Sequence, residues 1–204
     1  MPPNRRLFLK TELEPRLAEA EAGQRNVFFV DAAHFVVSSF LGWLWCACRL
    51  YVKAASGRQR YNVLGALNAV THDLVRVTNT TYITAATVCE LLQKIAALNL
   101  PTPVTLVMDN ARYQHCKMVE GLARTLNIEL LFLPSYSPNL NLIERLWKFV
   151  KKSVLNSRHQ ESFAHFQATI DECLDQLPTT YKPELQTLMT LKFQTFENVS
   201  MLAT

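Results

Sequence analysis

A chain of 204 residues with 49% hydrophobic and 19% charged residues can bury a sizeable core, which excludes a disordered protein. The net charge of +4 permits a nucleic-acid partner without requiring one. Five cysteines make an odd count without a CxxC pair. That pattern argues against a disulfide framework or a zinc site and favours a reducing, cytoplasmic compartment.

The sequence shows neither a secretion signal nor a membrane span. The basic residues Arg5, Arg6 and Lys10 precede no apolar segment of the kind that a signal peptide needs. Residues 35–48 form an uncharged apolar run, but its 14 residues are too few to cross a bilayer as a helix. We therefore expect buried strands in this run and no membrane partner.

The first third of the chain is expected to hold one helix and then several strands. Helical spacing over residues 7–22 predicts a helix that Gly23 ends. Apolar runs separated by turn residues predict strands at residues 27–30, 43–52, 61–70 and 74–78. We expect a turn at residues 57–60 and a hairpin around residues 71–73. Short connections between these strands favour antiparallel pairing.

Helices and strands alternate in the rest of the chain. The spacing of apolar residues from Val88 to Leu98 predicts a helix that Pro101 and Pro103 stop. Further elements are expected as a strand at 104–108, a helix at 118–126, a strand at 128–133, a turn at 134–139, a helix at 140–156 and at least two later helices. This order predicts a mixed α/β sheet whose later strands are joined by helical crossovers.

Three acidic residues stand at informative places in this pattern. Asp31 and Asp109 each follow an apolar run that predicts a buried strand, and Glu144 lies early in a predicted helix. Three carboxylates on separate elements suit a site that binds two Mg²⁺ ions and transfers a phosphoryl group. The alternatives are a strand-end turn acid for Asp31 and a helix N-cap for Asp109.

Glu144 has two alternative positions relative to the start of its helix. Asn141 and Glu144 are spaced as an N-terminal capping box, which would make the glutamate a capping residue. With Ser137 as N-cap and Pro138 at the first helical position, Glu144 would instead lie about two turns inside the helix.

Several basic residues are candidate DNA contacts. Lys148 and Lys151 or Lys152 lie on the helical face next to Glu144, where they could hold a phosphate or form a solvated basic face. Arg58 and Arg60 could touch the DNA backbone from a loop, or that loop could simply be solvated. His115 could contact DNA or the metal site, or be packed or solvated near the start of a helix.

Three segments resemble the catalytic motifs of bacterial insertion-sequence transposases of the mariner superfamily. Residues 28–34 (FFVDAAH) resemble the first motif, residues 107–115 (VMDNARYQH) the second, and residues 133–148 (LPSYSPNLNLIERLWK) the last. The 34 residues between Asp109 and Glu144 also match the superfamily spacing. The resemblance covers roughly residues 25–155 and is most specific in the last motif.

The resemblance implies an RNase H-like fold: three antiparallel strands, then parallel strands with helical crossovers, flanked by helices. It implies a DDE site in which Asp31, Asp109 and Glu144 bind two Mg²⁺ or Mn²⁺ ions, with the first aspartate shared between them. The implied reaction is strand cleavage at transposon ends, followed by strand transfer into target DNA. Two alternatives remain: an RNase H-like nuclease without strand transfer, and a non-catalytic DNA-binding or assembly module derived from a transposase.

The resemblance also divides the chain. We expect a helical lead-in at residues 1–24, the RNase H-like DDE catalytic core at residues 25–156 and a C-terminal helical extension at residues 157–204. Full-length relatives carry N-terminal helix-turn-helix domains, for which the lead-in is too short. The expected partners are therefore double-stranded DNA, a second copy of the chain and a separately encoded helix-turn-helix part, at the nucleoid of a bacterial cytoplasm.

Overall fold

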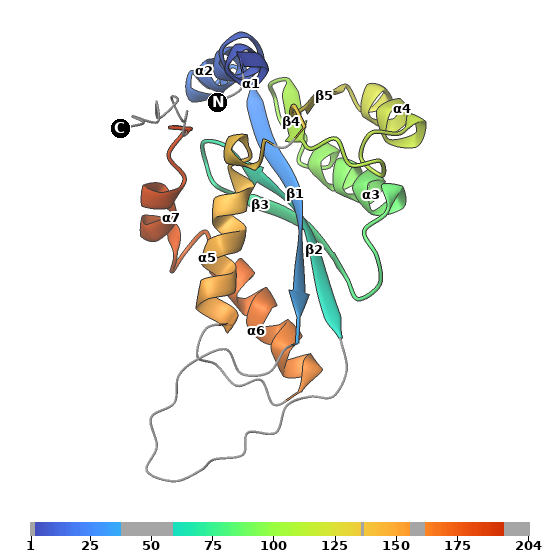
Figure 1. The fold of residues 1–204 in the computed structure, drawn as a ribbon, viewed down its shortest axis with the longest axis vertical. Helices are drawn as coiled ribbons and strands as arrows, with labels where there is room; N and C mark the ends of the chain where they lie inside the picture. Colours follow the sequence, from blue (N-terminus) through green and yellow to red (C-terminus); the bar gives the residue numbers. More distant parts are fainter. Residues whose placement is uncertain (1–2, 38–58, 136, 156–161, 194–204) are drawn as a thin grey trace, which may run out of the picture.

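The structure, a computed structural model, describes residues 3–37, 59–135, 137–155 and 162–193. These residues form a five-stranded mixed sheet in the order β3-β2-β1-β4-β5 (Figure 1). The strands are β1 (Asn26–Val36), β2 (Arg60–Asn68), β3 (Leu74–Asn79), β4 (Val104–Met108) and β5 (Ile128–Phe132). The first three strands pair antiparallel, whereas β4 and β5 run parallel to β1, as expected for an RNase H-like sheet. The predicted strand at 43–52 and Arg58 lie outside the described residues.

Helices cover both faces of this sheet (Figure 1). The crossover helices α3 (Ala85–Ala96) and α4 (Lys117–Thr125) pack on one face. The opposite face is covered by α5 (Ile143–Leu155), α6 (Phe163–Asp175) and α7 (Lys182–Leu188). Within the described ranges, no helix combines the length and the apolar character needed to cross a membrane.

The N-terminal segment is helical, as predicted, and packs on the same core as α5. It consists of α1 (Pro3–Phe8), a π-helical turn (Leu9–Leu13) and α2 (Glu14–Glu21). Gly23 follows with a φ of 71°, a left-handed conformation that glycine adopts without steric cost. Arg16 and Arg25 both hold the carboxylate of Glu129 on β5, at 2.6 and 2.8 Å, and so attach this segment to the sheet.

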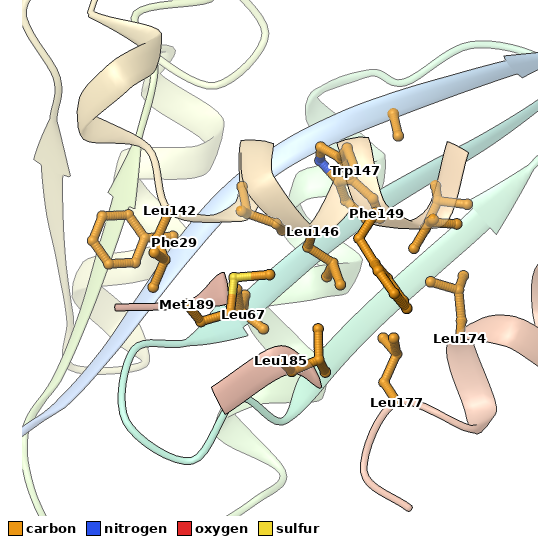
Figure 2. Close-up of a cluster of buried hydrophobic side chains, with 14 of the residues drawn as sticks. Phe29, Leu67, Leu142, Leu146, Trp147, Phe149, Leu174, Leu177, Leu185 and Met189 are labelled. Carbon is orange, nitrogen blue, oxygen red and sulfur yellow. The ribbon is translucent and has the colours of Figure 1, made fainter. Parts of the chain in front are cut away.

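Side chains of β1 alternate between the two cores, which decides where Asp31 points. Phe28 and Val30 lie in the core under α3 and α4, whereas Phe29 and Phe35 lie in the core under α5. The side chain of Asp31 therefore projects to the α5 face, since successive side chains of a strand point to opposite faces. Figure 2 shows that core with ten of its residues labelled: Phe29, Leu67, Leu142, Leu146, Trp147, Phe149, Leu174, Leu177, Leu185 and Met189.

Two predicted element boundaries are wrong. The first strand does not end at Asp31 but continues to Val36, because its pairing with β2 runs from Phe28 to Val36. The helix that carries Glu144 begins at Ile143 rather than at Leu140, because residues 138–140 form a separate 3₁₀ turn. Both corrections concern residues of the candidate site.

Candidate active site

Asp31 and Asp109 lie side by side where parallel pairing stops. The last paired residues of β1 and β4 are Phe29 and Val107, and each aspartate is two residues further along the chain: Asp31 lies within β1, and Asp109 directly follows β4. Val107 belongs to the core under α5, as Phe29 does. Residues two apart on a strand share a face, so both carboxylates project toward α5 at the carboxyl edge of β4. Open α/β sheets bind their ligands at this edge.

Glu144 reaches the same place from α5. It is the second residue of the helix, and its backbone N–H donates to the carbonyl of Asn141 at 3.3 Å. The proposed capping box is wrong, because the amide oxygen of Asn141 has no hydrogen-bond partner. The alternative that Ser137 caps the helix and Pro138 is its first residue is wrong for α5 too. Pro138 opens the 3₁₀ turn, with Ser137 before it, and α5 starts five residues later. Glu144 therefore lies in the first turn of α5.

The three acids line one cavity of about 330 Å³. Its wall also contains Asn110, Ala111, Leu133, Pro134, Ser135, Ser137, Pro138 and Asn141. Among the described residues, no three His, Cys, Asp or Glu side chains converge closely enough to enclose one metal ion. The polar donors of the cavity wall are oxygen and amide groups, a donor set that fits hard cations such as Mg²⁺ and Mn²⁺.

The electrostatics of the cavity favour a bound cation. Burial, together with the nearby carboxylates of Glu144 and Asp109, raises the pKa of Asp31 to about 7. The backbone N–H of Ala32 acts in the opposite direction. Burial, with Asp109 and Asp31 adding to it, also raises the pKa of Tyr113 to about 12. A divalent cation would remove this repulsion by pairing with the carboxylates.

The raised pKa of Asp31 predicts an unusual dependence of stability on pH. The folded pKa of about 7 exceeds the ordinary value of 3.8, so the folded state binds more protons between these values. The free energy of unfolding should therefore fall as pH rises from 4 to 7. An Asp31→Asn variant stays neutral and should be more stable than the wild type at pH 8, by a few kcal/mol at most, since one pKa unit corresponds to about 1.4 kcal/mol.

Urea unfolding in EDTA at pH 5 and pH 8 measures this difference. Asp73→Asn is the matched control, because Asp73 is an exposed carboxylate in the turn between β2 and β3. Its profile should run parallel to that of the wild type. Parallel profiles for Asp31→Asn and the wild type would contradict the prediction.

The candidate DNA contacts lie outside this cavity. Lys148 is exposed and lines a second cavity of about 590 Å³, which shares Pro138, Asn141 and Glu144 with the first. Lys151 and Lys152 are exposed further along α5. Lys192, which no motif in the sequence marks as a DNA contact, also lines the second cavity.

Arg60 and His115 make contacts within the protein. Arg60 opens β2, and its guanidinium lies 4.2 Å from the centre of the Tyr82 ring. The ring of His115 stacks on Phe132, and its Nε2 lies 3.2 Å from Glu120. Neither residue lines the cavity of the three acids.

The sequence of residues 26–167 matches the family described as DDE superfamily endonuclease. This match covers more than half of the chain. The chain belongs to the DDE superfamily endonucleases. No curated protein matches the sequence.

Solved structures of Mos1 transposase share the fold of this DDE endonuclease chain. The catalytic domain of Mos1 mariner transposase superposes with a TM-score of 0.57 at 14% identity, covering 94% of each chain. A pre-cleavage Mos1 transpososome gives 0.59 at 15% identity, covering 93% of this chain and 63% of the Mos1 chain. The Mos1 strand transfer complex gives 0.57 at 16% identity, with 93% and 62% covered. The present chain thus spans about 62% of the Mos1 chain in that complex.

Proposed function

We propose that this chain is the catalytic domain of a DDE transposase, which cleaves DNA at transposon ends and joins the 3′ ends to target DNA. The observation that carries the proposal is the meeting of Asp31, Asp109 and Glu144, from three separate elements, in one cavity. Their order along the chain is that of the DDE motifs. The fold similarity to the Mos1 catalytic domain supports the same reading.

Asp31, Asp109 and Glu144 are the proposed ligands of two Mg²⁺ or Mn²⁺ ions. Two such ions would supply activation of the attacking oxygen and stabilisation of the leaving 3′-oxygen at a DNA phosphate. The carboxylates of Glu144 and Asp109 both act on the charge of Asp31, which would suit a carboxylate shared between both ions. A Mos1 paired-end complex and the Mos1 catalytic domain have each been solved with Mn, which supports divalent metal chemistry here.

The second cavity is the proposed path of the DNA backbone toward the acids. Lys148 and Lys192 lie in its wall and Glu144 lies at its border with the first cavity. Arg145 contacts the protein itself. It donates to the carbonyls of Thr190 and Lys192, at 2.6 and 2.9 Å, and so holds the segment that follows α7 beside α5. Each phosphate that a lysine neutralises should make DNA binding fall with salt, by a log–log slope of about −0.9.

We also propose the wider assembly that the family resemblance implies. The chain would act as a dimer on double-stranded DNA, together with a separately encoded helix-turn-helix part that recognises the transposon ends. Its place would be the nucleoid of a bacterial cytoplasm, with residues 25–156 as the catalytic core between the N-terminal and C-terminal helices. Structures of Mos1 transposase have been solved as paired-end complexes, which supports transposon-end DNA as the substrate.

A joining assay tests the proposed activity. The protein is mixed with Mn²⁺, a labelled DNA duplex that carries a recessed 3′-hydroxyl end, and a plasmid target. We expect label covalently attached to the plasmid, which a strand transferase produces and a plain nuclease does not. Metal-dependent nicks without attached label would favour the nuclease, whereas unchanged duplex binding with and without metal and no cleavage would favour the assembly module.

A further inference from the structure

The backbone carbonyl of Val30 stands at a break in the sheet. The carbonyl of Val27 accepts from Ala69 N at 2.8 Å, so odd-numbered residues of β1 direct their backbone groups toward β2. Asn26 N donates to Pro103 O, so even-numbered residues direct theirs toward β4. Pairing with β4 ends one residue before Val30. Its carbonyl therefore faces the β4 side at a position where pairing with β4 has ended.

The side chain of Asn141 supplies the donor that β4 does not provide at this position. Its Nδ2 donates to the carbonyl of Val30 at 3.2 Å, and the residue is buried, with 5% of its surface exposed. A carbonyl can only accept, so this contact fixes which end of the amide faces the strand. The backbone carbonyl of Asn141 accepts from Glu144 N at 3.3 Å. One residue thus contacts the neighbour of Asp31 and also Glu144 itself.

The other end of the same amide is costly for stability. Oδ1 of Asn141 is buried and has no hydrogen-bond partner, although the residue lines the cavity of the three acids. A buried acceptor without a partner loses its hydration and gains no bond in return, and this cost offsets the stabilisation that the bond to Val30 contributes. An apolar side chain of similar size would stabilise the fold at least as well. The amide therefore has little value as a purely structural residue.

We propose that Asn141 is a positioning residue of the active site, which holds β1 at Val30 and thereby sets the carboxylate of Asp31 against that of Glu144. This inference rests on the proposed metal site and adds a residue to it. The side chains of Asp31 and Glu144 come from a strand and a helix that the chain joins only through more than one hundred intervening residues. Side-chain neighbours that orient metal ligands commonly change metal affinity by about 10–100-fold when they are removed.

Calorimetric titration with MnCl₂ tests the proposal on the full chain and two variants. Asn141→Ala removes the donor, and Asn141→Asp keeps the shape while replacing the donor by a carboxylate oxygen. Both variants should bind Mn²⁺ at least about tenfold more weakly than the wild type. Urea unfolding in EDTA should show little loss of stability in Asn141→Ala, because the lost bond and the removed unpaired oxygen offset each other.

Two further proteins make the outcome decisive. Asn26→Ala is the matched control, because Nδ2 of Asn26 donates to Thr102 Oγ1 at 2.6 Å at the other end of β1; it should keep the Mn²⁺ affinity of the wild type. Asp109→Ala tests the metal site itself.

If Asp109→Ala loses Mn²⁺ while Asn141→Ala binds it as the wild type does, the positioning role is overturned and the metal site stands. Equal or tighter binding by Asn141→Asp would also overturn it, and would make this residue an oxygen ligand instead. Absence of Mn²⁺ binding by the wild type would overturn both the metal site and the inference.

Discussion

Replacing Asp109 with asparagine should lower the rate of Mn²⁺-dependent DNA cleavage and joining by about three decades or more. Three decades correspond to about 4 kcal/mol of transition-state stabilisation, a size expected when one carboxylate leaves a two-metal site. Asparagine keeps the local structure, because Oδ1 of Asp109 accepts from Ala111 N at 3.0 Å and an amide oxygen can do the same. The loss would therefore report on charge and metal binding rather than on folding. Asp109→Ala should lose at least as much activity, together with the turn contact.

The rate is measured as single-turnover nicking of a supercoiled plasmid in Mn²⁺, with the thermal unfolding of each variant as the check on folding. Asp73→Asn provides the control for removal of one negative charge, since Asp73 is exposed and does not line the cavity. It should cleave as the wild type does. Near-normal cleavage by Asp109→Asn would place the chemistry elsewhere and rule out the proposed site.

The positions of Asp31 and Asp109 could be predicted because strand periodicity is a local signal. Each acid follows a mainly apolar run, and such runs predict buried strands wherever they occur. The end of β1 could not be predicted, because Asp31 pairs with Gly65 on a strand 34 residues away. The position of Asp31 next to Asp109 depends on where β4 stops, which is likewise a property of the sheet and not of either segment.

The surroundings of Glu144 were harder to predict for a related reason. Ser137, Pro138 and Asn141 each carry a signal for the start of a helix, and these signals compete within five residues. Where the helix begins depends on Val30, whose carbonyl is not paired with β4. This carbonyl accepts from the side chain of Asn141, which therefore does not cap the helix. Arg60 was a candidate as a basic residue of a predicted loop and His115 for its place shortly after Asp109. Their actual contacts with Tyr82 and Phe132 are tertiary.

Gly65 connects the hydrophobic core to the candidate site. It pairs with Asp31 across β1 and β2, on the face that α5 covers. A β-carbon at this position would lie 2.8 and 2.9 Å from two atoms of the Trp147 indole. That ring has little room to move, because it is 2% exposed and stands edge-on to Phe35 with ring centres 6.5 Å apart. Glycine is therefore required at residue 65 for lack of space rather than for backbone conformation.

A Gly65→Ala variant should consequently be less stable than the wild type by about 1–3 kcal/mol, the usual cost of overpacking a core. It should also bind Mn²⁺ more weakly, because Trp147 lies one turn after Glu144 on α5 and Gly65 itself pairs with Asp31. Displacing the ring would disturb both acids. Urea unfolding in EDTA and calorimetric MnCl₂ titration measure the two effects.

Gly121→Ala is the matched control for this substitution. Gly121 lies in α4, and a β-carbon there would meet nothing within 4 Å. Since glycine inside a helix costs about 0.5–1 kcal/mol relative to alanine, this variant should gain stability and keep its Mn²⁺ affinity. The same methyl group would thus destabilise the protein at residue 65 and stabilise it at residue 121. A stable Gly65→Ala variant with wild-type Mn²⁺ affinity would show that the indole can move without disturbing Asp31, and would separate the core under α5 from the geometry of the acids.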